Sequence, residues 1–404
     1  MTGSEIIRQL DGFIREAGER RRVLLIVPDY TRYHSNAGFI ANYLYHNLKA
    51  ELVELIEALG THVPMTDRQL GHMYGDIPKH SFIPHNWRDG LIRLGEVPGE
   101  FVAEVSGGLV RDPIPVEVNR RLFDGYDLVV SIGQVVPHEV VGMANHAKNI
   151  FVGCGGQAMI NASHMLGAFC GLEAAMGKDH SPARAVFDYA AEKYLAGLPL
   201  WYILTVTTAP AGVIETRGVF ISRGREGFEA AVALSREVNI TLLDEPVQTM
   251  VVWLDPEEFQ SCWLGNKAIY RTRMAIADGG ELFVLAPGAD KFGEDPAIDA
   301  LIRKYGYKGR ERVIRMCAEN ADLRGNLSAA AHLIHGSSDG RFKITYCTRR
   351  LTAEEVTGAG FEYMPFEEAS ERFAPETLRA GYNDGGIYFV PNPALGLWAY
   401  KARF

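Results

Sequence analysis

The fold is decided by the stretch VLLIVPDYTR at residues 23–32. Its first half is a continuous apolar run, typical of a parallel strand buried on both faces, and Pro28 and Asp29 end that run. A second run of the same kind, LVVSI at residues 128–132, leads into the loop GQVVPHEVVG. Such strands, alternating with helices, predict an α/β fold with largely parallel sheets flanked by helices.

The rest of the chain continues this alternation. Apolar residues at helical spacing predict a helix over 36–59 that Gly60 ends, and an Ala-rich helical region follows at 165–198. Further elements are expected on the same grounds, namely strands at 201–207, 218–222, 250–254, 281–286, 344–347 and 387–390 and helices at 227–238 and 257–277.

The chain has 404 residues, which favours two domains. Asp244-Glu245-Pro246 predicts a change of unit near 241–248. We therefore expect an N-terminal α/β domain over 1–243 and a C-terminal α/β domain over 244–404, with the active site in the cleft between them. The packing of 391–404 is left open between the second domain and a return to the first.

Composition excludes several classes of protein. The net charge is -9, which disfavours nucleic acid as a partner. Five cysteines without a C-x-x-C pair indicate a reducing compartment. Neither a signal peptide nor an apolar run of about 20 residues is present. We expect a soluble, cytoplasmic protein without a membrane partner, and we leave a homo-oligomer open.

Parallel sheets bind ligands beyond the carboxyl ends of their strands, so 28–36, 61–66 and 133–148 are the first segments to search. Arg32 suits a carboxylate or phosphate, although Asp29 as a helix cap with a solvated Arg32 explains the same residues. His62 suits proton transfer near neutral pH, although most isolated histidines are surface or hydrogen-bonded residues.

A second group of polar residues follows the strand at 128–132. His138, His146, Lys148, the glycine-rich turn at 153–156 and His164 lie within about 30 residues. Each histidine alone is more often structural, and the spacing fits no zinc or P-loop motif. Together they indicate a site.

Three further features each allow a functional and a structural interpretation. His85-Asn86-Trp87 either lines a substrate pocket or belongs to an ordinary polar loop. Cys154 is more readily a small packing residue than a nucleophile. Lys267 either points towards a ligand or is a helix-surface lysine.

These fragments, in this order, resemble the lactate racemase family, whose enzymes use a nickel-pincer nucleotide. The matching motifs are Asp29-Tyr30-Thr31-Arg32 (D-x-T-R), Gly60-Thr61-His62-Val63-Pro64-Met65-Thr66 (G-x-H-x-P-M-T), Pro137-His138-Glu139-Val140-Val141-Gly142 (P-H-x-x-x-G), Lys148, His164, Asn266-Lys267-Ala268 and Ala277-Asp278-Gly279-Gly280. The last two look like the start and end of a helix in the family's C-terminal domain.

The resemblance implies a role for each matching residue. Lys148 would carry the cofactor, pyridinium-3-thioamide-5-thiocarboxylic acid mononucleotide, through a thioamide, and His164 would ligate its nickel. His62 and His138 would be the two acid/base residues. Asp29 and Thr31 would lie at the cofactor, Arg32 and Lys267 would bind the substrate, and His85, Asn86 and Trp87 would line its pocket. Cofactor-synthesis enzymes would be partners during maturation.

The same resemblance implies the reaction, inversion of C2 in a 2-hydroxy acid. The C–H bond at C2 is only weakly acidic, so hydride transfer avoids a carbanion. One histidine takes the hydroxyl proton, a planar 2-keto acid forms, and return of hydride on the other face inverts the centre. Imidazole suits both proton transfers without large tuning of its pKa.

Departures from the family pattern concern the substrate. Asn145-His146-Ala147 stands where close relatives of lactate racemase have Gly-Gly-Arg before the lysine, and Val63 follows His62 where arginine is common. His34 and Asn36 add polar groups, which favour a substrate larger than lactate, such as a sugar acid. The alternatives are a non-catalytic carboxylate-binding protein and a nicotinamide-dependent 2-hydroxy acid dehydrogenase; the absence of G-x-G-x-x-G after the first strand disfavours the latter.

Overall fold

The structure is a computed structural model of the chain, and it describes residues 1–60, 62–209 and 213–404. The chain divides into two compact units. Unit 1 comprises residues 1–163 and 177–239, and unit 2 comprises residues 164–176 and 240–404. No helix within the described ranges is both long and apolar enough to cross a bilayer.

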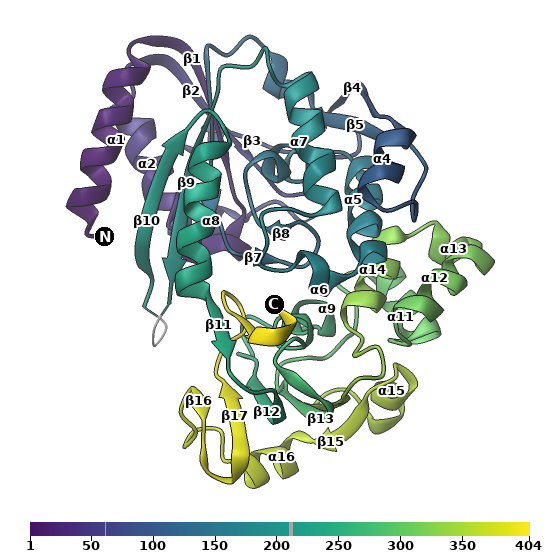
Figure 1. Cartoon of the computed structure of the whole chain (residues 1–404). Helices are drawn as coiled ribbons and strands as arrows, with labels where there is room; N and C mark the ends of the chain where they lie inside the picture. Colours follow the sequence, from purple (N-terminus) through teal and green to yellow (C-terminus); the bar gives the residue numbers. More distant parts are fainter. Residues whose placement is uncertain (61, 210–212) are drawn as a thin grey trace. The chain divides into compact units, whose positions relative to one another are not determined.

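Unit 1 is built on a six-stranded sheet of order β10-β9-β6-β1-β2-β3 (Figure 1). Its strands are β1 (Arg20–Val27), β2 (Ala50–Glu57), β3 (Phe82–Ile83), β6 (Leu128–Gln134), β9 (Leu200–Thr208) and β10 (Glu215–Ser222). All neighbours pair in parallel except β9 and β10. Residues 23–27 and 128–132 are buried, as the two apolar runs predict.

Helices cover this sheet, and short hairpins complete the unit. The helices are α1 (Gly3–Ala17), α2 (Ala37–Asn47), α3 (Asp67–Tyr74), α4 (Gly99–Val105), α7 (Pro182–Tyr194) and α8 (Arg225–Asn239), with the first residues of α5 (Gln157–Cys170). The paired strands are β4 (Leu91–Val97) with β5 (Ile114–Asn119) and β7 (Pro137–His138) with β8 (Gly142–Met143). Helix α8 packs on β9 and β10 (Figure 1).

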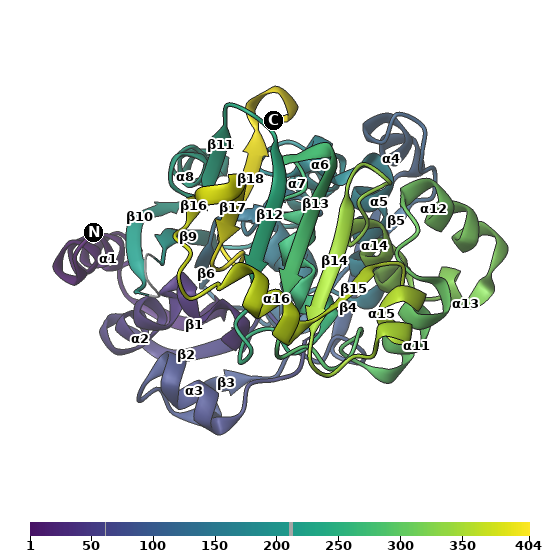
Figure 2. The same ribbon diagram turned by 90° about the horizontal axis from the view of Figure 1, so that it is seen from below.

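Unit 2 repeats the plan with a six-stranded sheet of order β15-β14-β13-β12-β17-β16 (Figure 2). Its strands are β12 (Val247–Trp253), β13 (Ile276–Leu285), β14 (Lys343–Thr348), β15 (Glu362–Pro365), β16 (Gly381–Tyr382) and β17 (Ile387–Val390). Only the edge pair β16–β17 is antiparallel. Both sheets are therefore largely parallel, and the predicted fold class is confirmed.

The remaining elements of unit 2 are mostly short helices. They are α6 (Leu172–Ala175), α9 (Cys262–Gly265), α10 (Lys267–Tyr270), α11 (Pro296–Tyr305), α12 (Arg310–Glu319), α13 (Ala321–Arg324), α14 (Leu327–His335), α15 (Ala353–Gly358) and α16 (Phe366–Phe373). A two-stranded sheet joins β11 (Ile240–Leu243) to β18 (Leu397–Tyr400).

The division between the units differs from the expected boundary at 243/244. Strand β11 pairs with β18 in parallel, so residues 240–243 belong to unit 2. The same pairing holds the end of the chain in unit 2, where Arg403 forms an ion pair with Asp278. Of the two packings left open for 391–404, the structure shows the one on the second unit.

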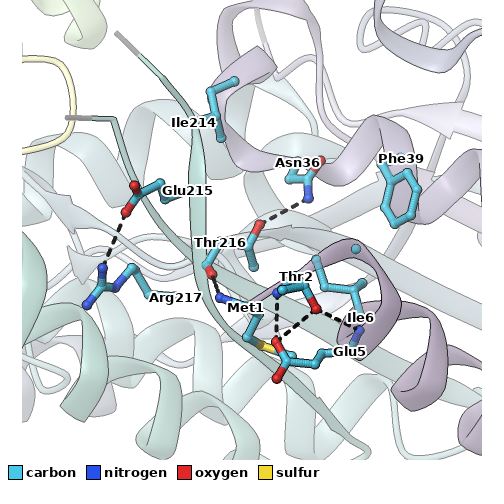
Figure 3. A pocket seen from close by; sticks show the side chains of 11 residues that line it. Met1, Thr2, Glu5, Ile6, Asn36, Phe39, Ile214, Glu215, Thr216 and Arg217 are labelled. Carbon is cyan, nitrogen blue, oxygen red and sulfur yellow. Dashed lines mark hydrogen bonds and ion pairs between the residues drawn. The ribbon is translucent and has the colours of Figure 1, made fainter. Parts of the chain in front are cut away.

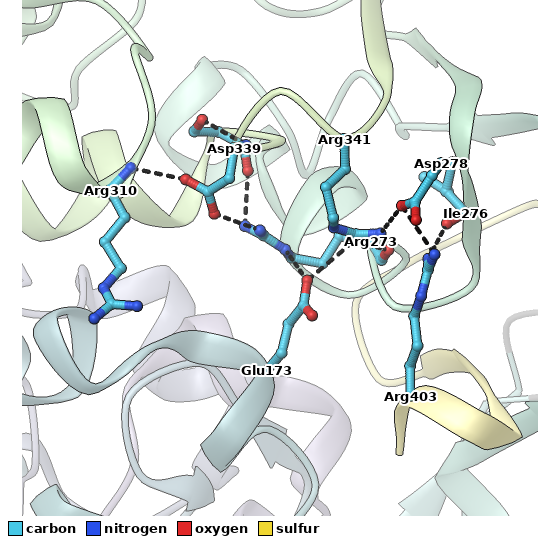
Figure 4. A network of polar contacts seen from close by, with 9 residues as sticks. Glu173, Arg273, Ile276, Asp278, Arg310, Asp339, Arg341 and Arg403 are labelled. Carbon is cyan, nitrogen blue, oxygen red and sulfur yellow. Dashed lines mark hydrogen bonds and ion pairs between the residues drawn. The ribbon is translucent and has the colours of Figure 1, made fainter.

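Residues 164–176 also belong to unit 2, although they precede the last part of unit 1 in sequence. Glu173 accepts hydrogen bonds from the Nε of Arg273 (2.8 Å) and from Arg341 (3.0 Å), as Figure 4 shows. Arg273 is almost fully buried and also binds Asp339 (2.7 Å). A buried guanidinium with two carboxylate partners fixes this segment to the unit.

Three expected helices are wrong or only partly correct. The helix expected over 36–59 ends at Asn47, and residues 50–57 form β2. The expected helix 257–277 is replaced by α9, α10 and the first residues of β13, so Ala277-Asp278-Gly279-Gly280 lies in a strand. The region 165–198 breaks into the end of α5, α6 and α7. Short apolar runs fit both the helical and the strand periodicity, and backbone pairing in a buried sheet decides which structure forms.

Candidate active site

Three loops of unit 1 begin at the same edge of the main sheet. Residues 28–36 follow β1, residues 58–66 follow β2, and residues 135–148 follow β6. Strand β1 lies between β2 and β6, and all three run in parallel. Parallel strands end at one edge, so the three predicted segments are neighbours. Thr61 of the second motif lies outside the described residues.

Asp29 and His62 form a hydrogen-bonded pair at this edge, in which the carboxylate is buried and the imidazole is exposed. Their Oδ2 and Nδ1 atoms are 2.8 Å apart, and the side chain of Asp29 is only 7% exposed. Burial raises the pKa of Asp29, but the charge and hydrogen bond of His62, with Arg32 and Thr31, outweigh it and hold the pKa well below its usual range. An ionised carboxylate only accepts hydrogen bonds, so His62 donates from Nδ1, and in the neutral ring Nε2 carries the lone pair.

Thr31 and Arg32 complete the first loop. Asp29 Oδ1 accepts hydrogen bonds from the backbone N–H of Thr31 (2.8 Å) and from its hydroxyl, so the expected helix-capping role of Asp29 is present as well. Arg32 Nη1 donates to the Thr31 hydroxyl at 2.9 Å. Arg32 is half-buried, so its guanidinium retains access to solvent.

The amine of Lys148 lies close enough to Arg32 and Asp29 for their charges to shift its pKa. Burial, followed by the charge of Arg32, lowers the pKa of Lys148 from 10.5 to about 8; Arg184 lowers it too, whereas Glu139 and Asp29 raise it. This lowering of the pKa favours the neutral amine, which is the form that attacks an acyl carbon. The structure thus brings together the lysine, Asp29 and Arg32.

His138 has a tautomer opposite to that of His62. The backbone N–H of Val140 donates to its Nδ1 at 3.2 Å, so the proton of the neutral ring lies on Nε2. Glu139 Oε2 lies 3.7 Å from the same Nδ1. His138 is buried, with 8% of its surface exposed. In the neutral rings, Nδ1 is therefore the hydrogen-bond donor in His62 and the acceptor in His138.

His164 lies on α5, at the residue where the chain passes from unit 1 to unit 2. Its side chain is half-buried and makes contacts of its own. Among the described residues, no group of three or more His, Cys, Asp or Glu could hold a metal ion. A metal held mainly by a cofactor needs one protein ligand only, and imidazole suits nickel. The donor set at His164 and the lysine amine therefore fit the expected group.

The three residues expected to line the substrate pocket are engaged with protein atoms. His85 is buried; its Nε2 lies 3.1 Å from the carbonyl of Gly155 and its Nδ1 lies 3.0 Å from Asn119 Nδ2. Burial lowers the pKa of His85 from 6.5 to about 4, so the ring is neutral. Both ring nitrogens have protein partners, which is the geometry of a structural histidine.

Asn86 and Trp87 lie in the loop that follows. Asn86 donates to Asp89 (3.1 Å) and accepts from the backbone of Arg88 (3.2 Å). The Arg88 guanidinium lies 3.8 Å from the centre of the Trp87 ring. Their contact with a substrate stays a prediction.

Lys267 begins α10 in unit 2. Its Nζ lies 3.9 Å from Glu258 and 5.2 Å from the centre of the Phe259 ring. The side chain is 18% exposed, so it is not the solvated helix-surface lysine of the alternative reading. Substrate binding by Lys267 stays a prediction.

Sequence reasoning missed residues that support the loops from a distance. Glu57 is buried and accepts a hydrogen bond from the backbone of Met65 (3.1 Å), which fixes the loop around His62. Tyr74 donates to the carbonyl of Pro28, directly before Asp29. No local pattern marks these residues, because their partners are 8 and 46 positions away. Cys154 is fully buried and its pKa is raised by burial, which agrees with a packing residue.

One cavity lies elsewhere in unit 1. It measures about 550 Å³ and lies between the start of α1, Asn36, Phe39 and β10 (Figure 3). Asn36 donates to Thr216 there (3.0 Å). No predicted catalytic or cofactor-binding residue lines it, so it does not mark the candidate site.

The chain is similar to known proteins in part of its sequence and in its fold. The family model described as the lactate racemase N-terminal domain matches residues 8–177. A crystal structure of a Thermotoga maritima protein matches with a TM-score of 0.86 and 24% identity, covering 99% of each chain. The lactate racemase apoprotein of Thermoanaerobacterium thermosaccharolyticum matches with a TM-score of 0.72 and 18% identity, covering 95% of this chain and 88% of that one. No curated protein matches. The resemblance to the lactate racemase family is confirmed.

Proposed function

We propose that this chain, whose residues 8–177 match the lactate racemase N-terminal domain, is an isomerase that inverts C2 of a 2-hydroxy acid. The observation that carries the proposal is the Asp29–His62 hydrogen bond of 2.8 Å, formed where Arg32 and Lys148 also gather. A proton acceptor, a cation for a carboxylate and a reactive amine are the protein groups that this chemistry needs.

The nickel-pincer nucleotide is the cofactor that we propose. Lys148 would hold it covalently, His164 would hold its nickel, and Asp29 and Thr31 would border it. When bound, the cofactor supplies the acceptor and donor of hydride. The fit rests on the neutral fraction of the Lys148 amine and on the imidazole of His164.

The two histidines would move the hydroxyl proton. In His62, Nε2 carries the lone pair and can take the proton, while Asp29 holds Nδ1–H and stabilises the imidazolium that results. In neutral His138, Nε2–H would donate a hydrogen bond to the substrate oxygen, and transfer of a proton to that oxygen would require the imidazolium form. If that ring becomes an imidazolium, Glu139, 3.7 Å from Nδ1, stabilises its charge. The roles exchange when the reaction runs in the other direction.

The carboxylate of the substrate would pair with Arg32, whose planar guanidinium suits two-point binding. Lys267 would bind a second substrate oxygen. Holding the keto acid between the two half-reactions prevents its escape into solvent. That the site lies in a cleft between two domains stays a prediction, as do a cytoplasmic location and the cofactor-synthesis enzymes as partners.

We propose a substrate larger than lactate, such as a sugar acid. Support comes from the polar residues His34, Asn86 and Trp87, whereas His85 is occupied by Gly155 and Asn119. A panel of lactate, longer 2-hydroxy acids and aldonates, followed by chiral separation, tests this. Turnover of lactate alone would exclude a sugar acid.

The test of the class is mass analysis of protein co-produced with the pincer-cofactor synthesis enzymes. We expect an adduct on the peptide that contains Lys148 and about one nickel per chain. A known lactate racemase, loaded in the same host, is the control. Absence of both adduct and nickel, with the control loaded, refutes the cofactor and favours a carboxylate-binding protein that retains Arg32.

A further inference from the structure

The backbone just before Lys148 follows an unusual path. Asn145 and His146 are two consecutive residues other than glycine with positive φ, 70° and 58°. Residues other than glycine rarely adopt this left-handed backbone conformation, and they keep it only when the surrounding structure imposes it. Glycine would adopt this path freely, whereas asparagine and histidine must be held in it.

Arg184 holds this path from α7. The side chain is 1% exposed, and its Nη1 donates to the carbonyl of Asn145 at 3.1 Å while its Nη2 donates to the carbonyl of Met143. A planar guanidinium can bind two carbonyl oxygens at a fixed separation, which no other side chain does as well. Ser181 accepts a hydrogen bond from the Arg184 backbone (3.0 Å) and so anchors the start of α7.

Packing fixes the same two residues from the other side. The ring of His146 lies 4.2 Å from that of Tyr202 and 5.2 Å from that of Phe228, measured between ring centres. The guanidinium of Arg184 lies over the same Phe228 ring at 4.6 Å. At Gly133, a Cβ atom would come within 2.2 Å of the Asn145 amide nitrogen, so only glycine admits that side chain.

This arrangement is costly for the fold. It buries a guanidinium whose pKa is lowered by burial to about 10, and it retains two residues in a strained backbone region. Such cost is typical of functional sites, and Lys148 lies two residues beyond His146. The charged groups that act on the Lys148 amine are Arg32, Glu139, Arg184 and Asp29.

We propose that Arg184 is a positioning residue that holds the 143–148 loop so that the Lys148 amine is presented for acylation. This inference rests on the proposed function in one respect, the identity of the acyl group that Lys148 carries in the cell. The presentation of the amine itself does not, because it is a property of the cofactor-free chain.

The test measures acetylation of Lys148 by N-hydroxysuccinimide acetate in cofactor-free protein, against pH, by peptide mass analysis. The neutral amine takes the acetyl group, N-hydroxysuccinimide leaves, and one proton is released. In the parent we expect half-maximal reaction near pH 8. In Arg184→Met, loss of the nearby charge and of the loop's support raises the midpoint by about one pH unit, so the rate at pH 8 falls roughly fivefold.

Matched variants separate positioning from general stability. Arg223→Met removes an exposed arginine that lies over Trp201 and should retain the parent midpoint. In Arg184→Ala, millimolar guanidinium should restore the parent rate, whereas a merely destabilised chain gains nothing from it. If Arg184→Met does not fold, the same substitution with Asn145→Gly and His146→Gly relieves the strained path, and its midpoint should still be raised.

A folded Arg184 variant with the parent midpoint and no response to guanidinium overturns the proposal. Measuring cofactor loading in the same variants distinguishes failure of this proposal from failure of the proposed function. If the parent acetylates near pH 8 and Arg184→Met does not, yet neither acquires a nickel-pincer adduct, the positioning role stands and the proposed cofactor fails.

Discussion

His62 donates from Nδ1 to Oδ2 of Asp29 across 2.8 Å, and this contact fixes which ring nitrogen of His62 can accept a proton. The carboxylate is 7% exposed, so water does not compete for it. The contact joins the loops after β1 and β2, and it is the geometric basis for treating His62 as a general base.

Asp29→Asn should lower kcat of the loaded enzyme by roughly 10²- to 10⁴-fold, because an amide can hold the other tautomer of His62 and stabilises no imidazolium. Racemisation is followed by chiral chromatography, with the Lys148 adduct measured in parallel. Asp76 makes a comparable but exposed contact with His46 (2.9 Å). Asp76→Asn should leave kcat unchanged; an equal loss in both variants contradicts a specific role for Asp29.

His62→Ala and His138→Ala should each abolish turnover while the adduct on Lys148 remains. Each substitution removes the proton-transferring nitrogen of one ring without removing the amine. Intact mass and turnover are measured on the same preparation. His46→Ala, which removes an exposed histidine, is the control and should remain active. Loss of the adduct in both site variants refutes the acid/base assignment.

His164→Ala should lower nickel content more than adduct content, because the imidazole binds the metal and the covalent bond lies at Lys148. We expect at least tenfold less nickel after gel filtration, measured by elemental analysis. Tightly held nickel in the variant, at the parent level, argues against ligation by His164.

Acid should destabilise the chain through two buried histidines. Burial lowers the pKa of His85 to about 4 and of His146 to about 3, from 6.5. The unfolded state thus binds protons first, so the free energy of unfolding falls as pH drops below about 6.5, by roughly 1.4 kcal/mol per pH unit for each histidine.

His146→Asn tests this dependence, since asparagine tolerates the left-handed backbone and does not titrate. Between about pH 6 and pH 4 the slope of unfolding free energy, from urea titrations, should decrease by roughly 1.4 kcal/mol per pH unit. His80→Asn, at an exposed position, should retain the parent slope. An unchanged slope in His146→Asn means that His146 is protonated in the fold.

Arg273→Met should destabilise unit 2 by about 3 kcal/mol, because it removes a buried guanidinium that donates to Glu173, Asp339 and the carbonyl of Ser337. Arg350→Met removes an exposed ion pair with Asp290 (3.2 Å) and should cost less than about 1 kcal/mol. Urea unfolding of both variants checks the difference. Equal effects show that burial adds nothing to the Arg273 network.

Part of the site was predictable from sequence. Ordered motifs predict Asp29, His62, His138, Lys148 and His164 as site residues, and their roles stay predictions. The loops after β1, β2 and β6 do begin at one edge of the sheet, as the strand pattern indicates. Their partners were not predictable. Nothing near His138 marks Glu139 as more than a surface residue, and nothing near Lys148 marks Arg184, which is 36 positions away.

The sequence by itself determined what depends on local pattern. The largely apolar runs at 23–27 and 128–132 indicate buried parallel strands, since a strand covered on both faces accommodates successive apolar residues. The tertiary structure decided what depends on distant contacts. Residues 50–57 form a strand because their backbone pairs with β1, a partner distant in sequence. Residues 164–176 belong to unit 2 because Arg273 and Arg341 bind Glu173. Hydrogen bonds and burial act through space, so chain distance does not reveal them.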